Sequence, residues 1–183
     1  PKLTRLGSAE WNSITKKVKR ETEEIAKELL VIYAERKTAK GFGFQSHDKQ
    51  MKLFEETFEY EETPGQLKAS KDVLDDMEKE IPMDRLVCGD VGFGKTEVAM
   101  RAAFKAVLNK KQVAVVSPIT ILADQHYRSF KKRMDDFGVR VEMLSRFRSG
   151  AEQKKIVALL EKGEIDIIIG THRLLQKDIK FKD

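Results

Sequence analysis

The sequence contains one cysteine, Cys88, and therefore cannot form an intramolecular disulfide bond. This excludes a small secreted scaffold held together by disulfides and favours a reducing compartment. We expect Cys88 itself to be a small, buried residue of a strand. No apolar run approaches the roughly 20 residues that cross a membrane, and no signal-peptide core follows the N-terminus. A cytoplasmic protein that does not use a membrane as its partner is predicted.

The chain also lacks internal repeats, low-complexity tracts and a strong excess of one charge. Its 35 lysine and arginine residues against 30 acidic residues give a formal net charge of +5, a mild bias toward polyanions that does not identify a function. The 183 residues suffice for one domain, or one domain with an appendage. Because the sequence starts with Pro1 and its last four residues contain no cap or turn, we expect a piece of a longer protein.

Apolar residues near the N-terminus recur in steps of three, four or seven, which places them on one stripe of a helix. They are Trp11, Ile14, Val18, Ile25, Leu29 and Ile32. Ser8 is a suitable N-cap, and Gly41 follows the last periodic turn. The pattern predicts a helix about 40 Å long. It could lie on its own domain or connect that domain to another part of a protein.

From residue 86 onward, short apolar runs alternate with helical patterns. Strands are predicted at 86–88, 113–116, 139–144 and 165–169, and helices at 96–108, 122–134 and 151–160; a further helix is predicted at 66–79. Strands joined by helical crossovers pair in parallel, and such sheets are covered on both faces. The predicted fold class is therefore α/β with a parallel sheet and a long N-terminal helical extension.

Residues 89–96 match the phosphate-loop pattern G-x-x-x-x-G-K-[ST] without a mismatch, between a predicted strand and a predicted helix. They are Gly89, Asp90, Val91, Gly92, Phe93, Gly94, Lys95 and Thr96. Glycines let backbone N–H groups converge on phosphates, and the helix start adds a partial positive charge. We expect Lys95 to reach the terminal phosphates and the Thr96 hydroxyl to hold Mg²⁺.

A glutamine upstream of the loop suggests which base the nucleotide carries. Gln66 follows a Thr-Pro-Gly turn, with Phe58 and Tyr60 shortly before it. A glutamine amide can pair with both the N6 donor and the N7 acceptor of adenine, and an aromatic ring can stack on the base. These residues favour ATP over GTP.

Five segments resemble, in order and spacing, the first motor lobe of superfamily-two helicases: Gln66, the loop 89–96, and residues 117–123, 145–149 and 170–175. Within that superfamily the chain is most similar to the bacterial transcription-repair coupling factors, over its whole length, including Lys2, Leu3 and the long helix. The resemblance implies a RecA-like P-loop NTPase lobe at residues 46–183 and a helical linker at 1–45. It also implies that Phe58 and Gln66 contact adenine.

The resemblance further implies that three segments face double-stranded DNA without reading its sequence; their residues are Pro118, Arg146, Arg148, Ser149, Thr171, His172 and Arg173. Independently, Pro118 and Gly170 follow predicted parallel strands, and ligands bind at the carboxyl ends of such strands. Several cations there could neutralise backbone phosphates. His47 and His126 have no partner at metal-ligand spacing and are interpreted as structural.

By resemblance, an Asp-Glu motif that completes hydrolysis lies beyond Asp183, and an arginine lies in a second lobe. The sequence Val73-Leu74-Asp75-Asp76 is rejected as that motif because it falls on a predicted helix. The parent protein is thus expected to be an ATP hydrolase that displaces stalled RNA polymerase and helps recruit excision-repair proteins, whereas this piece alone is expected to be inactive. Three alternatives stay open: a branch-migrating DNA helicase, a small-molecule kinase, and a non-catalytic interaction module.

Overall fold

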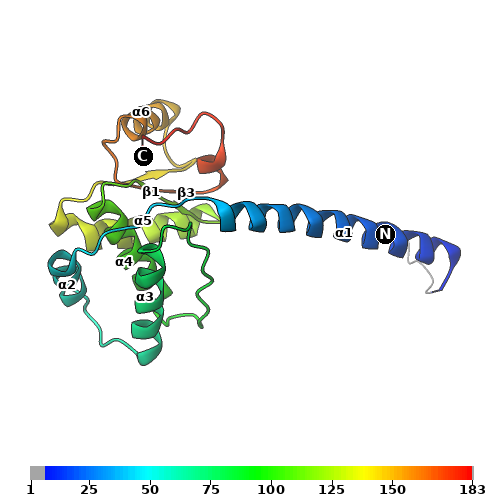
Figure 1. Cartoon of the computed structure of the whole chain (residues 1–183). Coiled ribbons are helices and arrows are strands. Elements are labelled where there is room, and N and C mark those ends of the chain that lie inside the picture. The colour runs from blue at the N-terminus through cyan, green and yellow to red at the C-terminus, as the bar shows by residue number, and fades with distance from the viewer. Residues whose placement is uncertain (1–6, 183) are drawn as a thin grey trace.

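A three-stranded parallel sheet lies at the centre of the α/β part of the chain, in the order β1-β3-β2 (Figure 1). The structure is a computed structural model that describes residues 7–182. The strands of the sheet are β1 (Val113–Val116), β2 (Val141–Leu144) and β3 (Ile167–Gly170). Val113 and Val141 both pair with Ile167, and both ladders continue in parallel to Gly170. The predicted parallel sheet is confirmed for these strands.

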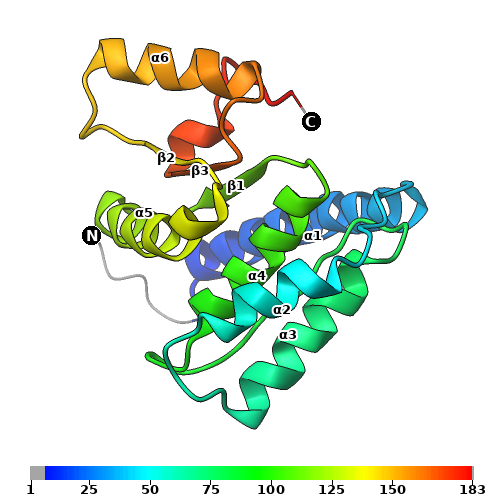
Figure 2. The ribbon, with the colours of Figure 1, turned by 90° about the vertical axis from the view of Figure 1, so that its left-hand side faces the viewer.

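Helices cover both faces of the sheet (Figure 2). In chain order they are α1 (Ala9–Thr38), α2 (Asp48–Glu56), α3 (Pro64–Met77), α4 (Lys95–Leu108), α5 (Thr120–Met134) and α6 (Gly150–Glu161), with the short 3₁₀ helices η1 (Asp135–Phe137) and η2 (His172–Leu175). Five of the α-helices agree with the sequence predictions to within a few residues. The helix α2 was not predicted.

The central strand β3 is buried on both faces, as its unbroken run of isoleucines requires. Ile167 and Ile169 belong to a cluster with residues of α2, α4 and α5, in which the rings of Phe54 and Phe104 stack with centroids 4.3 Å apart. Ile168 points to the opposite side, into a cluster with Leu144 and residues of α6. The sheet is therefore a middle layer between two apolar cores.

The prediction of a strand at residues 86–88 is wrong. This segment is irregular, the Leu86 side chain is 86% exposed, and Cys88 is exposed rather than buried in a strand. A strand needs a neighbour that accepts its backbone hydrogen bonds. Val87 and the residues of β1, Val113 to Val116, line one cavity of about 470 Å³ together with residues of α3 and α4, and the segment 86–88 does not pair with β1.

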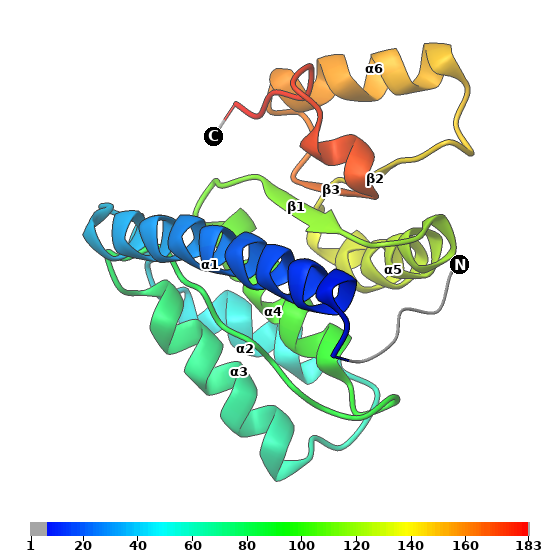
Figure 3. The same cartoon turned by 90° about the vertical axis from the view of Figure 1, so that its right-hand side faces the viewer.

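The helix α1 is as long as its periodicity predicts, with 30 residues and the Ser8 hydroxyl accepting a hydrogen bond from the Trp11 backbone N–H. None of its residues is buried, and it projects away from the α/β part in Figure 1 and toward the viewer in Figure 3. An ion pair between Arg36 and Asp84 links its last turn to the segment before the phosphate loop. The helix does not lie flat on its own domain. Lys2, Leu3 and Asp183 lie outside the described residues.

Among residues 7–182, no helix combines the length and the apolar character that crossing a membrane requires.

An ion-paired aspartate on α3 fixes the segment that leads into the phosphate loop. Asp76 accepts a hydrogen bond from Arg85 at 2.5 Å and one from Lys79 at 2.7 Å. These two hydrogen bonds, that from Arg85 first, hold the pKa of Asp76 at about 2, below its ordinary value of 3.8. The sequence Val73-Leu74-Asp75-Asp76 lies within α3, which agrees with its rejection as a catalytic strand.

Because the pKa of Asp76 is lower in the folded chain, its contribution to stability is fully present above about pH 4 and is lost as the pH falls toward 2. We predict that Asp76→Asn lowers the melting temperature at pH 7, and that the difference from wild type disappears near pH 2. Asp75→Asn, an exposed neighbour on the same helix, is the matched control. A difference that persists unchanged at pH 2 contradicts the assignment.

Candidate functional site

The loop of residues 89–94 turns sharply before α4, in a backbone conformation that requires glycine. Gly92 and Gly94 have φ angles of +87° and +66°, a region that residues with a Cβ rarely adopt. Gly94 is the N-cap of α4 and has no side chain with which to cap it. The N–H groups at the start of α4 therefore have no side-chain cap, and an uncapped helix start suits an anion.

Lys95 folds back over this loop. Its ammonium group donates hydrogen bonds to the carbonyl oxygens of Gly89 at 2.5 Å and Asp90 at 2.6 Å. A cation held at the mouth of a glycine-rich turn, beside the positive end of a helix, fits a phosphate chain. The loop thus has the donors and the backbone shape that the sequence pattern predicts for a nucleotide.

Gln66 is fixed by two interactions that orient its amide. Its Oε1 accepts a hydrogen bond from the Thr63 backbone N–H at 2.7 Å, which completes a capping box at the start of α3. Its Nε2 donates to the carbonyl oxygen of Phe93 at 3.2 Å. An amide has a second N–H and a second lone pair, so Gln66 can still pair with a base while it holds the loop.

A cleft of about 690 Å³ joins most of the predicted nucleotide contacts. Its lining includes Phe58, Gln66, Gly92, Phe93, Gly94 and Thr96. Gly89, Asp90 and Lys95 line an adjoining cavity of about 270 Å³, which shares Gln66 and Phe93 with the cleft. Val91 is 98% exposed at the tip of the loop and lines neither. His126, interpreted from the sequence as structural, lines the larger cleft.

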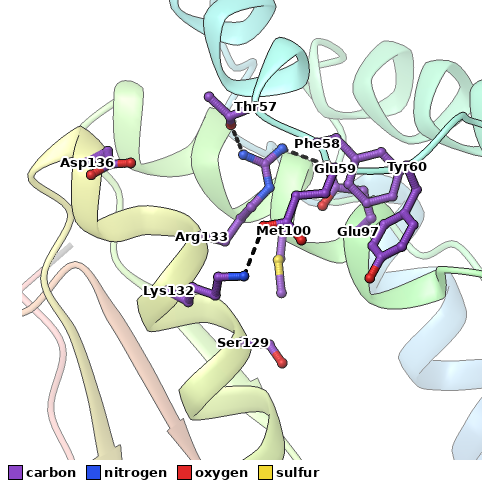
Figure 4. Close-up of a pocket in the computed structure, with 10 residues that line it drawn as sticks. All are labelled: Thr57, Phe58, Glu59, Tyr60, Glu97, Met100, Ser129, Lys132, Arg133 and Asp136. Carbon is purple, nitrogen blue, oxygen red and sulfur yellow. Dashed lines mark hydrogen bonds and ion pairs between the residues drawn. The ribbon is translucent and has the colours of Figure 1, made fainter.

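A further cavity of about 330 Å³ continues from this cleft past Phe58 and Tyr60 toward the C-terminal half of α5 (Figure 4). The two rings meet edge to face, with centroids 5.6 Å apart. Lys132 donates a hydrogen bond to Glu59 at 2.9 Å, and this bond lowers the pKa of Glu59 and raises that of Lys132. The segment that carries the aromatic rings is thereby attached to α5.

Beneath the aromatic segment lies a buried ionic network that sequence reasoning missed. One carboxylate oxygen of Glu97 accepts hydrogen bonds from Arg101 and Arg133, each at 3.1 Å. Arg101, 2% exposed, also pairs with Glu62 at 2.6 Å. Burial lowers the pKa of Arg101, but its hydrogen bonds to Glu62 and Glu97 outweigh that effect and raise the pKa above its ordinary value. The available signal was the Glu97–Arg101 spacing of four on a helix whose other residues are mostly apolar.

The carboxyl ends of the three parallel strands gather a second group of predicted residues. A cavity of about 480 Å³ is lined by Pro118, Arg146, Thr171, His172 and Arg173, together with Ile119, Thr120 and Gln153. Arg146 and His172 are exposed there. Arg173 forms a two-pronged pair with Asp178 at 2.8 and 2.6 Å, and the pair raises the pKa of the arginine.

Arg148 and Ser149, predicted for the same surface, do not line this cavity. Arg148 lies over the ring of Tyr127, 6.0 Å from its centroid, and pairs with Glu152 at 3.8 Å. The Ser149 hydroxyl accepts a hydrogen bond from the Glu152 backbone N–H and caps α6. Both residues therefore have structural contacts in the present arrangement.

Residues 7–182 contain no group of three or more His, Cys, Asp or Glu side chains that could hold a metal ion by themselves. Thr96, half-buried in the cleft beside Gly94, is the side chain that would hold Mg²⁺ arriving with a nucleotide.

The motifs described above lie in a region that matches a known protein family. The sequence model of the DEAD/DEAH box helicases matches residues 63–183, which is more than half of the chain. The chain belongs to the DEAD/DEAH box helicase family. The phosphate loop and all the strands lie inside the matched range, so the resemblance seen in the sequence motifs is confirmed.

Relatives also match the part of the chain that precedes this helicase region. The chain is 54% identical over 181 residues to the transcription-repair-coupling factor of Escherichia coli and 49% identical over 183 residues to that of Bacillus subtilis. These matches include 99% and 100% of the chain but only 16% of each relative. The chain is therefore a homologue of one section of the coupling factors.

A solved structure of RecG bound to a three-way DNA junction matches with a TM-score of 0.75 and 36% identity, covering 83% of this chain and 21% of RecG. The helicase MrfA matches with a TM-score of 0.53 and 15% identity, over 72% of this chain and 20% of MrfA, and shares the fold. The RecA-like α/β fold of this helicase lobe is confirmed.

The contacts of Lys95 and Gln66 predict separate effects on nucleotide binding. Lys95→Ala should abolish binding, because the cation of the loop is lost, whereas Lys68→Ala, an exposed lysine of α3, should not. Gln66→Glu keeps the oxygen that caps α3 but removes the amide donor, and it should erase a preference for ATP over GTP of roughly tenfold. Calorimetric titration measures both effects; equal binding of ATP and GTP by the wild-type chain contradicts the role of Gln66.

Proposed function

We propose that this chain is the ATP-binding half of a motor that moves on double-stranded DNA in transcription-coupled repair and displaces stalled RNA polymerase. Three findings support the proposal: a complete phosphate loop, Gln66 in the same cleft, and identity of 49 and 54% to coupling factors. The last of these carries the proposal, because it extends to the long helix before the helicase region. In this proposal residues 1–45 are a helical linker and residues 46–183 are the first motor lobe.

In the proposed site each residue has a defined task. The loop N–H groups and Lys95 bind the phosphates, Thr96 holds Mg²⁺, and Gln66 reads the adenine edge beside Phe58. The bound nucleotide supplies the phosphoanhydride bond whose hydrolysis drives a motor. Since Gln66 donates to the carbonyl of Phe93 within the loop, a shift of its amide on base binding also changes the phosphate loop. Base recognition and phosphate binding are thereby linked.

The proposed DNA surface is the cavity at the strand ends, where Arg146, His172 and Arg173 meet Pro118 and Thr171. Cations and backbone groups at such an edge contact phosphates and carry no sequence information, which suits a motor that must pass over any sequence. Arg173 must exchange Asp178 for a phosphate in order to contribute. Binding of RNA polymerase and excision-repair proteins is assigned to other parts of a longer protein.

The related motor lobe of a branch-migrating helicase is the second candidate. It is favoured by the RecG likeness, at 36% identity over 83% of the chain. Identity to the coupling factors is higher and extends over 99% or more of the chain, so we prefer the first proposal. Membership in a helicase family argues against a small-molecule kinase.

The arginines at the strand ends predict how DNA binding depends on salt. Binding of mixed-sequence duplexes should be weak and indifferent to sequence, and log affinity should fall by about 0.9 per phosphate contact for each unit of log salt. Replacing Arg146 and Arg173, the two arginines of this cavity, with alanine should flatten this slope. Asp178→Asn should strengthen binding, because it frees Arg173, whereas Asp75→Asn, with the same change of charge on α3, should have less effect. An unchanged slope in the double variant would overturn the assignment.

We also predict that residues 1–183 bind ATP without turning it over. Hydrolysis requires a carboxylate that orients Mg²⁺ and water and a cation that meets the charge of the transition state. The described residues bring no acidic cluster to the loop. The prediction is contradicted by steady Mg²⁺-dependent release of phosphate that disappears in Lys95→Ala. The chain would then be a complete small enzyme.

A further inference from the structure

Two arginines with no assigned role converge on one carboxylate beside the proposed nucleotide cleft. Glu97 stands two residues after Lys95, in the first turn of the helix that the phosphate loop caps. Its Oε1 atom accepts from Arg101 on the same helix and from Arg133 on α5. Because Glu97 and Arg101 are less than a tenth exposed, these hydrogen bonds compete little with water.

The same two arginines hold the segment that carries Phe58. Arg101 pairs with Glu62 at 2.6 Å, and its guanidinium carbon lies 5.9 Å from the centre of the Phe58 ring. Arg133 donates a hydrogen bond to the carbonyl oxygen of Phe54 at 2.5 Å. It also donates to the hydroxyl of Thr57, the residue immediately before Phe58 (Figure 4). Both ends of the short segment 57–62 are therefore attached to guanidinium groups that share Glu97.

We propose that Arg101 is a positioning residue that sets the Phe58 ring against the base, and that Glu97 joins this setting to the start of the phosphate-loop helix. The proposal rests on the proposed nucleotide site. Arg101 lines neither the cleft nor the cavity of Figure 4, so it acts through Phe58 and Glu62 rather than by touching the nucleotide. Replacing Arg101 should therefore weaken binding of the base and leave binding of the phosphates unchanged.

Several features of the network allow Arg101 to be replaced without loss of the fold. In Arg101→Met, Glu97 keeps its hydrogen bond from Arg133, and Glu62, whose side chain is already 25% exposed, can turn to solvent. Methionine has a similar length and fills the apolar part of the site. No carboxylate is left buried without a partner, which is the usual reason that breaking a buried pair is so costly.

The test compares ATP with inorganic tripolyphosphate, which has the phosphates and no base, by calorimetry on the whole chain. In Arg101→Met, affinity for ATP should fall about tenfold, the size of one lost base-stacking contact, while affinity for tripolyphosphate is unchanged. In the Phe58→Ala background, Arg101→Met should cause no further loss. Glu62→Gln, which alters only the solvent side of the network, should give a smaller loss in the same direction.

Arg128→Met is the matched control, because Arg128 pairs with Asp124 on its own helix and is exposed. An equal loss of ATP and tripolyphosphate, an additive loss in the Phe58→Ala background, or no loss at all overturns the positioning role. If Arg101→Met does not fold, the same comparison of ATP and tripolyphosphate affinities in Glu62→Gln tests the positioning role. A wild-type chain that binds ATP no better than tripolyphosphate would instead refute the proposed adenine site itself.

Discussion

Both edges of β3 are hydrogen-bonded to parallel strands, and this pairing fixes where the loops of the proposed DNA surface leave the sheet. Val116 and Leu144 both pair with Gly170, so the residues that follow the three strands, Ser117, Ser145 and Thr171, emerge at one edge. All three are buried, and the Ser117 backbone N–H donates to the Gly170 carbonyl at 2.8 Å. The isoleucines of β3 anchor this arrangement to apolar cores on both faces, which makes the edge a fixed platform for the exposed cations after it.

The nucleotide cleft depends on a different set of contacts, between helices. Gln66 at the start of α3 bonds to the phosphate loop, and Glu97 at the start of α4 bonds to Arg133 of α5 and, through Arg101, to the aromatic segment. The base side and the phosphate side of the cleft are thus joined twice, once through the amide of Gln66 and once through the buried carboxylate of Glu97. This double connection gives a physical route by which a bound nucleotide can affect α5, the helix that follows the proposed DNA contact Pro118.

Local patterns predicted most of the helices and three strands, because apolar periodicity, caps and glycines act within a few residues. The capping box of Thr63 and Gln66 and the phosphate loop are of this kind. The strand at 86–88 failed because a strand exists only with a neighbour, and no strand pairs with this segment among the described residues. The helix α2 and the contacts of Glu97 with Arg133 were missed because they depend on residues 36 or more positions apart. The positions of Arg148 and Ser149 depend on the partners Tyr127 and Glu152, which the motif pattern does not specify.

The central claim is that one cleft, between the aromatic segment, Gln66 and the phosphate loop, holds an adenine nucleotide. The most direct measurement is a crystal structure of the chain with Mg²⁺ and a non-hydrolysable ATP analogue. We expect the phosphates to lie against the N–H groups of residues 92–96, with Lys95 released from the carbonyls of Gly89 and Asp90. We expect the base to lie between Phe58 and the Gln66 amide. A nucleotide bound elsewhere, or phosphates bound there with the base away from Gln66 and Phe58, would contradict it.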